Sequence, residues 1–331
     1  MGTSLTGRIW PIPKIEYCPA SQWRESRSAA LVYSRAAWEA VGPALRGIHV
    51  VARAEAIEAT EAHWDSLAEE LRGEVVYAVG GGLAVDAAKY VAVRRNLPLI
   101  CIPTALSVDA FLTWASGVRR ADCVRYIETK PPDLLVVDLD LIAASPPRVR
   151  AAGICDVLSI ATGCADWEYA HAAGKNPSHA PYIPYVADVA RGILRGALEC
   201  AEAAGRGDTA GLKQLLDCLA LEVQLCNLIG HSRPEEGSEH YFAYAVENIL
   251  GKGLPHGDLV GPGILYMARA LGIDPCPLER AMCDCAVPLS NIPADAVRAT
   301  LESLPDYCRR NELAHGIAHD LDPSRIGALL S

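Results

Sequence analysis

The chain has 331 residues, a net charge of −10 and 51% hydrophobic residues. This length is sufficient for two domains with substantial cores. Acidic and basic residues are interspersed, which argues against nucleic-acid binding and against an anionic membrane partner. No apolar run approaches the roughly 20 residues of a membrane span, and the N-terminus lacks the apolar core of a signal peptide. We therefore expect a soluble, cytoplasmic protein.

The twelve cysteines are scattered through apolar segments, and no C-x-x-C pair occurs among them. This pattern favours buried, reduced thiols over disulfides or a zinc ribbon. Cys276, Cys283 and Cys285 lie close together in the sequence, but their spacing fits no zinc-binding pattern.

The first half of the chain alternates short apolar runs with helix-compatible segments, which predicts a parallel sheet covered on both faces. After Pro147 strand signals almost cease, and apolar residues recur at spacings of three and four. We expect a Rossmann-like α/β domain at residues 1–145 and an all-α domain at 146–331, with cofactor and metal facing each other between them. The expected strands are 29–35, 47–53, 74–80, 97–104 and 134–138; the expected helices of the second half are 148–172, 182–205, 209–230, 238–250, 257–271, 276–286 and 293–311.

The third expected strand ends in Gly80-Gly81-Gly82 and leads directly into a helix. Glycines at such a turn allow the backbone to approach a pyrophosphate, and the helix N-terminus supplies free N–H groups. A triple glycine can also be only a tight turn. The next strand ends at Thr104, and Ser107 and Asp109 follow in the loop where ligands of open α/β sheets bind. This context favours a nucleotide site.

A metal site is indicated by His240 and His256, because a helix at 241–250 followed by an extended return through 251–255 can bring both imidazoles to one point. Asp156 lies near the start of an apolar helix and offers a third ligand. Two histidines and one carboxylate leave a coordination position open, as a catalytic metal requires. Such a site suits Zn, Ni, Fe(II) or Mn. Most histidines are surface or satisfied core residues, so the spacing alone is weak evidence.

Five motifs occur together in a fixed order. They are Gly80-Gly-Gly-x3-Asp86-x2-Lys89, Pro103-Thr104-Ala-x-Ser107-x-Asp109, Ala152-Gly-x-x-Asp156, Ser232-Arg-Pro-x-x-Gly-Ser-Glu-His240 and His256-Gly. The chain thereby resembles the sn-glycerol-1-phosphate dehydrogenase branch of the dehydroquinate synthase-like and iron-containing alcohol dehydrogenase superfamily. The resemblance covers residues 25–272 and implies hydride transfer between a nicotinamide and a small polyol or polyol phosphate.

The resemblance also implies roles for individual residues. Asp156, His240 and His256 match the metal ligands. Asp109 matches a carboxylate near the nicotinamide and substrate, while Lys130 and Arg233 fall in stretches that approach the substrate. The cofactor-binding residues that it implies are Gly80, Gly81, Gly82, Asp86, Thr104 and Ser107. Lys89 is either a helix-surface lysine or a cleft lysine that meets phosphate or substrate. Relatives are usually dimeric or larger, so we expect a homo-oligomer, with a homodimer as its simplest form.

The end of the first strand bears on the choice between NAD and NADP. NAD-selective relatives tend to have an acidic residue there, which pairs with the ribose hydroxyls and repels a 2′-phosphate. This chain has Ser34-Arg35 instead. A hydroxyl followed by a guanidinium tolerates that phosphate, so we expect NADP(H) use.

Several positions depart from the family pattern. Glu235 and Glu236 lie between Pro234 and Gly237, where two carboxylates would repel a substrate phosphate. The segment after residue 272 has no counterpart in the resemblance. Two further functions remain open: a cyclase or lyase like dehydroquinate synthase with recycled NAD, whose ligand pattern has Glu in place of Asp156, and a non-catalytic nucleotide-binding subunit.

Overall fold

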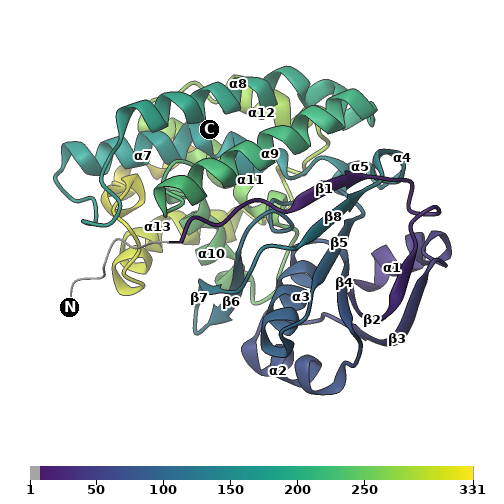
Figure 1. Ribbon diagram of the computed structural model, residues 1–331. Coiled ribbons are helices and arrows are strands. Elements are labelled where there is room, and N and C mark those ends of the chain that lie inside the picture. Colours follow the sequence, from purple (N-terminus) through teal and green to yellow (C-terminus); the bar gives the residue numbers. More distant parts are fainter. Residues whose placement is uncertain (1–7, 331) are drawn as a thin grey trace.

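The computed structural model describes residues 8–330 and consists of a parallel sheet with its covering helices and a layer of longer helices beside it (Figure 1). The sheet has six strands within these residues, in the order β1-β8-β5-β4-β2-β3, and all of its pairs are parallel. Its strands are β1 (Lys14–Tyr17), β2 (Glu25–Tyr33), β3 (Ile48–Glu55), β4 (Val75–Gly80), β5 (Leu99–Pro103) and β8 (Leu134–Val137). A separate antiparallel hairpin is formed by β6 (Ala115–Arg120) and β7 (Cys123–Glu128).

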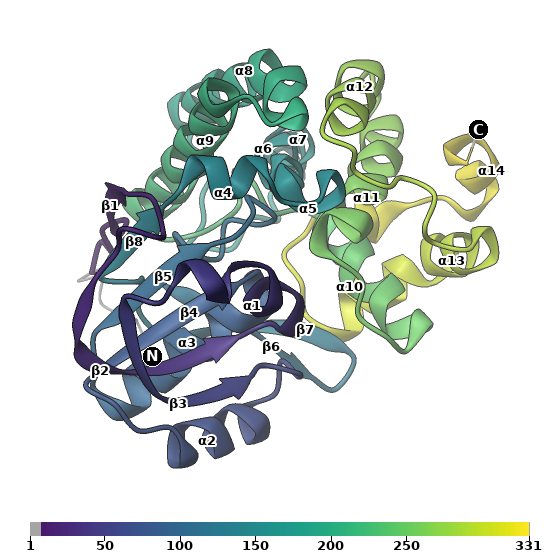
Figure 2. The ribbon, with the colours of Figure 1, turned by 90° about the vertical axis from the view of Figure 1, so that its right-hand side faces the viewer.

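The sheet is covered on both faces because its strands are apolar at successive positions. In β2, Ala30 and Val32 belong to the core shared with α2 (Glu61–Glu70) and α3 (Gly82–Arg95). Ala29 and Leu31 belong to a second core, on the side of α1 (Arg35–Val41). This alternation follows from the two-residue period of a strand. Figure 2 shows the sheet with helices on either side of it.

Helices make up the second half of the chain, as the spacing of its apolar residues predicts. They are α4 (Leu139–Ala143), α5 (Pro147–Arg150), α6 (Ile154–Leu158), α7 (Ile160–Ala172), α8 (Pro184–Arg206), α9 (Thr209–Ile229), α10 (Ser238–Leu250), α11 (His256–Leu271), α12 (Cys276–Asp284), α13 (Ala294–Arg310) and α14 (Ile326–Leu329), with short 3₁₀ turns at Ile317–Asp320 and Pro323–Arg325. A further 3₁₀ turn, Gly42–Ala44, lies in the first half of the chain. The division at residue 145 stays a prediction.

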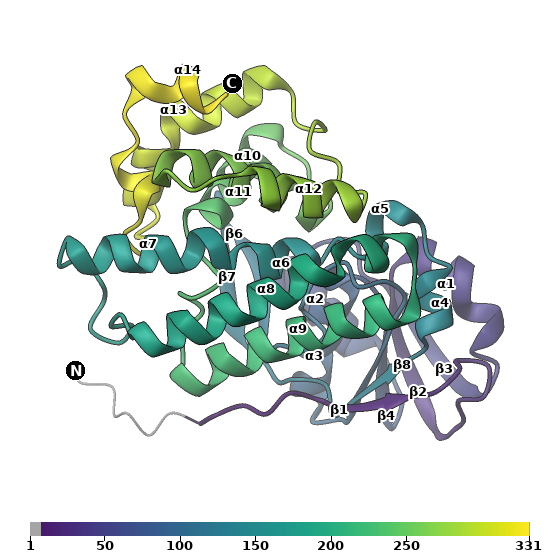
Figure 3. The same ribbon diagram turned by 90° about the horizontal axis from the view of Figure 1, so that it is seen from above.

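The longest helices, α8 and α9, run side by side along the outside of this layer (Figure 3). Gly207 ends α8 in the left-handed region with φ +82°. Asp208 caps α9 by accepting hydrogen bonds from the amides of Ala210 and Gly211. A glycine C-cap followed directly by an aspartate N-cap reverses the chain within two residues, which sets the two helices antiparallel.

The structure corrects the expected strand set by adding β1 and the β6–β7 hairpin. Edge strand β1 pairs in parallel with β8, so the sheet begins with residues that precede the first expected strand. In the described part of the chain, no helix is long and apolar enough to cross a membrane. All twelve cysteines are free thiols.

Candidate metal and dinucleotide site

The turn from β4 to α3 has the backbone of a phosphate-binding loop. Gly80 has φ +144°, and a Cβ added there would lie 2.4 Å from the Ser34 hydroxyl. Glycine is therefore required at this position, both for the conformation and for the close approach of β2. Gly81 is the N-cap of α3, so the first amide groups of that helix are free at the carboxyl end of the sheet.

The loop after β5 joins this turn to the helical half. A Cβ on Gly81 would lie 3.3 Å from Ser107 Oγ, which places that hydroxyl beside the glycine turn. Thr104 directly follows β5, at the same edge of the sheet. The Leu106 amide donates to the Arg150 carbonyl at 2.9 Å, and its own carbonyl accepts from the Gly153 amide at 2.8 Å. The loop is thus fixed to the segment that leads into α6.

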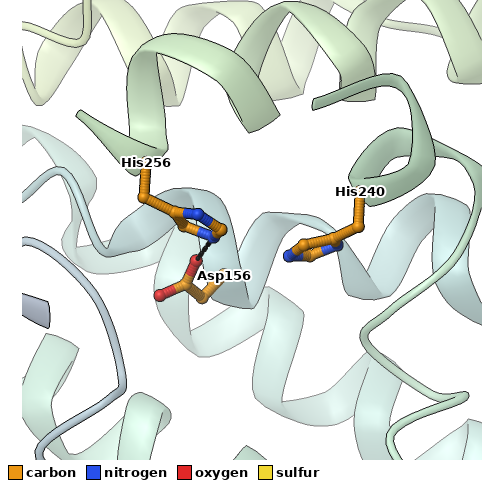
Figure 4. A group of neighbouring side chains, drawn as sticks. All are labelled: Asp156, His240 and His256. Atoms are coloured by element: carbon orange, nitrogen blue, oxygen red, sulfur yellow. Dashed lines mark ion pairs between the residues drawn. The ribbon is translucent and has the colours of Figure 1, made fainter. Parts of the chain in front are cut away.

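Three predicted ligands meet at this junction. Asp156 lies in α6, His240 lies in the first turn of α10, and His256 is the first residue of α11. One ligand atom from each lies within 4.8 Å of the other two. Nε2 of His256 is 3.0 Å from Oδ1 of Asp156, and the two imidazole centroids are 5.4 Å apart. Figure 4 shows the three side chains pointing toward one another.

The donor chemistry of this group fits a divalent metal ion. Oδ1 of Asp156 is buried and has no hydrogen-bond partner among the described residues, although His256 Nε2 is within contact distance. A buried oxygen without a partner is costly unless a cation occupies the position beside it. Oδ2 of Asp156 accepts the Asp109 amide at 2.8 Å, which fixes the carboxylate plane. Nitrogen and oxygen ligands lie about 2.0–2.2 Å from a zinc ion, so two ligand atoms of the same ion are about 3 Å apart. The distance between His256 Nε2 and Asp156 Oδ1 agrees with this spacing.

Glu239 contacts His240 directly, although nothing in its motif singles it out. Its carboxylate is fully buried, and Oε1 lies 2.9 Å from His240 Nδ1. That contact leaves Nε2 of the imidazole for the metal, as in carboxylate–histidine–metal arrangements. Burial lowers the pKa of His240, but the hydrogen bond and charge of Glu239, with Glu236 and Glu235, overcome this and raise it to about 10. The Gly237 amide holds Glu239 at 2.5 Å.

Comparison with known proteins agrees with this geometry. The sequence profile of the iron-containing alcohol dehydrogenase family matches residues 21–146. A glycerol-1-phosphate dehydrogenase [NAD(P)+] from Sulfurisphaera tokodaii is 30% identical over 265 residues, which cover 80% of this chain and 72% of that protein. This chain belongs to the iron-containing alcohol dehydrogenase superfamily. A second such dehydrogenase, from Saccharolobus islandicus, is 30% identical over 210 residues, and the match spans only 59% of its length.

Solved structures of the superfamily share the whole fold. A probable glycerol dehydrogenase from Sinorhizobium meliloti 1021 superposes with a TM-score of 0.70 at 17% identity, covering 98% of this chain and 97% of that one. The glycerol dehydrogenase of Schizosaccharomyces pombe gives 0.67 at 21% identity, covering 98% and 89%. At these identities the likeness concerns the fold, and it confirms the predicted class of a parallel-sheet domain followed by helices.

Asp109 lies beside the candidate ligand Asp156, and its role near the nicotinamide and substrate stays a prediction. Its backbone contacts Asp156, and its side chain is partly exposed. Burial and the negative charge of Asp156 raise its pKa to about 8, and the nearby Lys89 opposes this shift. Loss of solvation disfavours the charged form of a carboxyl group, and a neighbouring carboxylate adds to that effect.

Ser34 and Arg35 directly follow β2, although the expected strand included them, and Ser34 lies next to the glycine turn. The Arg35 guanidinium is exposed, and it is held by Glu55 at the end of β3, with Nε and Nη2 at 3.0 and 2.5 Å from Oε2. Glu55 lies 20 residues along the chain from Arg35, so the motif alone does not identify this partner. If NADP were bound, Glu55 would compete with its 2′-phosphate for the guanidinium and would repel that phosphate.

Asp86 and Lys89 have structural positions in this member of the superfamily. Lys89 is fully buried and pairs with Asp86 at 2.8 Å; its Nζ also donates to the Ala110 carbonyl at 3.0 Å. Asp86 Oδ2 accepts the Gly117 amide at 3.0 Å, which attaches the β6–β7 hairpin to α3. Lys89 is therefore neither a helix-surface lysine nor a lysine that meets phosphate or substrate in a cleft, the two interpretations that the sequence allowed. The carboxylate of Asp86 already has these partners, and its expected contact with the cofactor stays a prediction.

Lys130 is not brought to the site. Its Nζ pairs with Asp133 at 2.6 Å, just before β8, and approaches the Leu97 carbonyl, just before β5. These are the amino ends of the strands, whereas the glycine turn and the metal ligands lie at the carboxyl ends. Lys130 lines a surface pocket there, together with Trp10 and residues 11–14. Its contact with the substrate therefore has no support from this position and stays a prediction.

Arg233 has no hydrogen bond or ion pair with the candidate ligands among residues 8–330. It is 5% exposed, and Nη2 donates to the His315 carbonyl at 2.9 Å while Nη1 donates to the Tyr241 hydroxyl at 3.3 Å. Its guanidinium thus fastens the turn before α10 to the C-terminal segment. One partner lies eight residues away and the other 82 residues away, so the pairing could not be read from the motif, and the role as a substrate ligand stays a prediction.

Proposed function

We propose that this protein is a metal-dependent, NAD(P)-linked dehydrogenase that transfers hydride between a nicotinamide and a small polyol or polyol-derived substrate. The convergence of Asp156, His240 and His256 carries the proposal, since these residues come from three helices and leave a buried carboxylate oxygen without a hydrogen bond. The superfamily membership and the names of the glycerol-1-phosphate dehydrogenase relatives support it.

The described residues divide the work between two sets. Asp156, His240 and His256 would hold the ion, and the amides of the Gly81–α3 turn would bind the pyrophosphate with the Ser107 hydroxyl beside them. When bound, the metal ion would act as a Lewis acid on the substrate oxygen and the nicotinamide would carry the hydride. Asp109 would orient a substrate hydroxyl or relay a proton. In the oxidising direction the substrate loses a hydride from its carbinol carbon and a proton from its hydroxyl, and a carbonyl group forms.

The structure supports a weaker preference for NADP(H) over NAD(H) than the sequence predicts. Ser34 places no carboxylate against a 2′-phosphate, which supports NADP(H). Glu55 nevertheless occupies the guanidinium of Arg35. We propose that the enzyme uses both dinucleotides, with a modest preference for NADP(H).

Alanine substitution of the three ligands tests the metal site. We expect Asp156→Ala, His240→Ala and His256→Ala to lose bound metal and activity while keeping dinucleotide affinity. His49 is an exposed residue on β3, and the control variant His49→Ala should keep metal, activity and dinucleotide affinity. Metal content by elemental analysis and NAD(P)H formation with polyols are the measurements. A fully active His256→Ala enzyme would refute the assignment.

A further inference from the structure

The β6–β7 hairpin lies between α3, which begins at the glycine turn, and α10, which carries a candidate metal ligand (Figure 1). Strand β6 is fastened to α3. The Gly117 amide donates to Asp86 Oδ2 at 3.0 Å, and the Ser116 hydroxyl donates to the Asp86 carbonyl at 3.2 Å. Lys89 Nζ, which is fully buried, donates to the Ala115 carbonyl. The position of β6 is therefore fixed relative to α3.

The other side of the hairpin contacts the helical half. Arg119 pairs with Glu247 of α10 at 2.9 Å, and the Tyr126 hydroxyl lies 3.2 Å from the Tyr244 hydroxyl of the same helix. The Arg119 side chain is 47% exposed, and exposed ion pairs contribute little. The hairpin tip, at Asp122, binds α13 instead, through its carbonyl and its carboxylate. The link between the hairpin and α10 thus depends mainly on the two tyrosine hydroxyls.

The hydrogen bonds around Tyr244 have a fixed direction. Its hydroxyl lies 2.7 Å from Glu236 Oε1, and a carboxylate can only accept. Tyr244 therefore gives its one proton to this bond and accepts a hydrogen bond from Tyr126. The other oxygen of Glu236 accepts the Ser232 hydroxyl at 2.6 Å. A chain of hydrogen bonds thus runs from β7 into the turn before α10, and the bonds of such a chain strengthen one another.

This chain braces the first turn of α10. Tyr244 follows His240 by four residues, and the two ring centroids are 6.3 Å apart. Glu236 and Ser232 belong to the turn that leads into the helix, where the Glu236 amide donates to the Ser232 carbonyl at 2.8 Å. The hydroxyl of Tyr244 therefore joins the helix to the turn before it, and His240 lies between the two joined points in the sequence. A shift of Tyr126 is transmitted to the segment that holds a candidate ligand.

Tyr126 is attached to α10 mainly by its hydroxyl group. The residue is 53% exposed, so its ring contributes little buried apolar surface. The tip of the hairpin keeps its contacts with α13 when that hydroxyl is removed. Tyr126→Phe therefore breaks the chain of hydrogen bonds at its first member and leaves the fold intact.

We propose that Tyr126 is a positioning residue that couples dinucleotide binding to metal binding. A dinucleotide on the glycine turn would order α3 and, through β6, the hairpin. A metal ion on His240 would order the first turn of α10. The hydroxyl chain joins these two parts, so the ligand that binds second would meet a partly ordered protein and bind more tightly. Each ligand would raise the affinity of the other by the same factor. This inference rests on the proposed function, because it requires both ligands to bind.

Fluorescence titration with NADH, on the zinc-loaded and on the metal-free full-length protein, tests this coupling. We expect zinc to lower the Kd of NADH about two- to tenfold, the range that one net hydrogen bond supplies. Tyr126→Phe should remove this difference, while the Kd of NADH for the metal-free protein and the affinity for zinc without NADH stay unchanged. Two control variants should keep the wild-type difference: Tyr185→Phe, at a 70% exposed position of α8, and Arg119→Gln.

Three results would overturn the inference. Zinc could fail to change the Kd of NADH in the wild type, or could change it equally in Tyr126→Phe, as a direct effect of the ion's charge would. Loss of the difference in Arg119→Gln would assign the coupling to the ion pair instead. A wild-type protein that binds NADH or zinc but not both would refute the proposed function itself. Circular dichroism and NADH binding by the metal-free variant check that Tyr126→Phe is folded.

Discussion

Replacing Glu239 by glutamine tests whether the metal site depends on a charged partner of its histidine. The carboxylate is fully buried, so its interaction with His240 Nδ1 at 2.9 Å is not screened by solvent. Glutamine keeps the length of the side chain and an oxygen that can accept the same hydrogen bond. It removes only the negative charge, which makes the imidazole more basic and fixes its tautomer.

The expected loss in metal affinity is about tenfold to a hundredfold, the usual effect of removing such a partner. This range corresponds to about 1.4–2.7 kcal/mol. The free energy of unfolding of the metal-free protein should change by no more than about 1 kcal/mol. Two effects on the stability of the metal-free protein oppose each other. The Gly237 amide loses a charged acceptor at 2.5 Å, which is destabilising. Asp166 loses the repulsion of the Glu239 charge, which is the second cause, next to burial, of the rise of its pKa to about 6.

Competition with a chromogenic chelator measures the affinity, and urea unfolding of the metal-free protein measures the stability. Glu247→Gln is the matched control, because Glu247 lies in the same helix and pairs with Arg119 near the surface. An unchanged affinity in Glu239→Gln would refute the reasoning. A loss of affinity that Glu247→Gln reproduces would show that any charge change in α10 is sufficient.

Three further substitutions probe buried and surface charges elsewhere. Lys89→Met should destabilise the protein by about 3–5 kcal/mol in urea unfolding, because it strands a buried carboxylate; a loss below 1 kcal/mol would contradict this. His231, packed edge-on against Trp167 at 5.2 Å, has its pKa lowered by burial to about 4, so stability should fall as the pH drops from about 6.5 to 4. His231→Phe should flatten that part of the stability–pH curve, and an unchanged slope would contradict it. Glu55→Gln should raise kcat/KM for NADPH relative to NADH a few-fold by freeing Arg35, and no change would show that the pair does not reach the 2′-phosphate.

The sequence predicts those elements whose residues alone determine them. Strands β2, β4 and β5 are apolar on both faces, and such runs indicate a buried parallel sheet without knowledge of their neighbours. The helices after residue 147 repeat apolar residues at helical spacing over several turns. The three candidate ligands could be predicted because His240 and His256 flank a short helix, and the chain that follows this helix is long enough to bring the two imidazoles together. Asp156 lies near the start of another helix that faces them.

The elements that sequence analysis misses depend on distant partners or unusual turns. Strand β1 has four residues, none of them buried, and becomes a strand only by pairing with β8. The β6–β7 hairpin turns at Ala121, which adopts φ +55° without a glycine or asparagine to mark the turn. The partners of Lys130 and Arg233 were missed for the same reason, since short motifs do not reveal which neighbour binds a long cationic side chain.

The C-terminal segment, which matches no motif, explains how the metal site is held. The Ile317 amide donates to Asp166 Oδ1 at 2.7 Å, and Oδ2 of the same carboxylate accepts the Ser238 amide at 2.7 Å, two residues before His240. A Cβ on Gly316 would lie 2.1 Å from that oxygen, so the segment approaches as closely as a backbone can. Because a single buried carboxylate joins the chain end to the first turn of α10, the position of a metal ligand is set by residues more than 70 positions away in both directions.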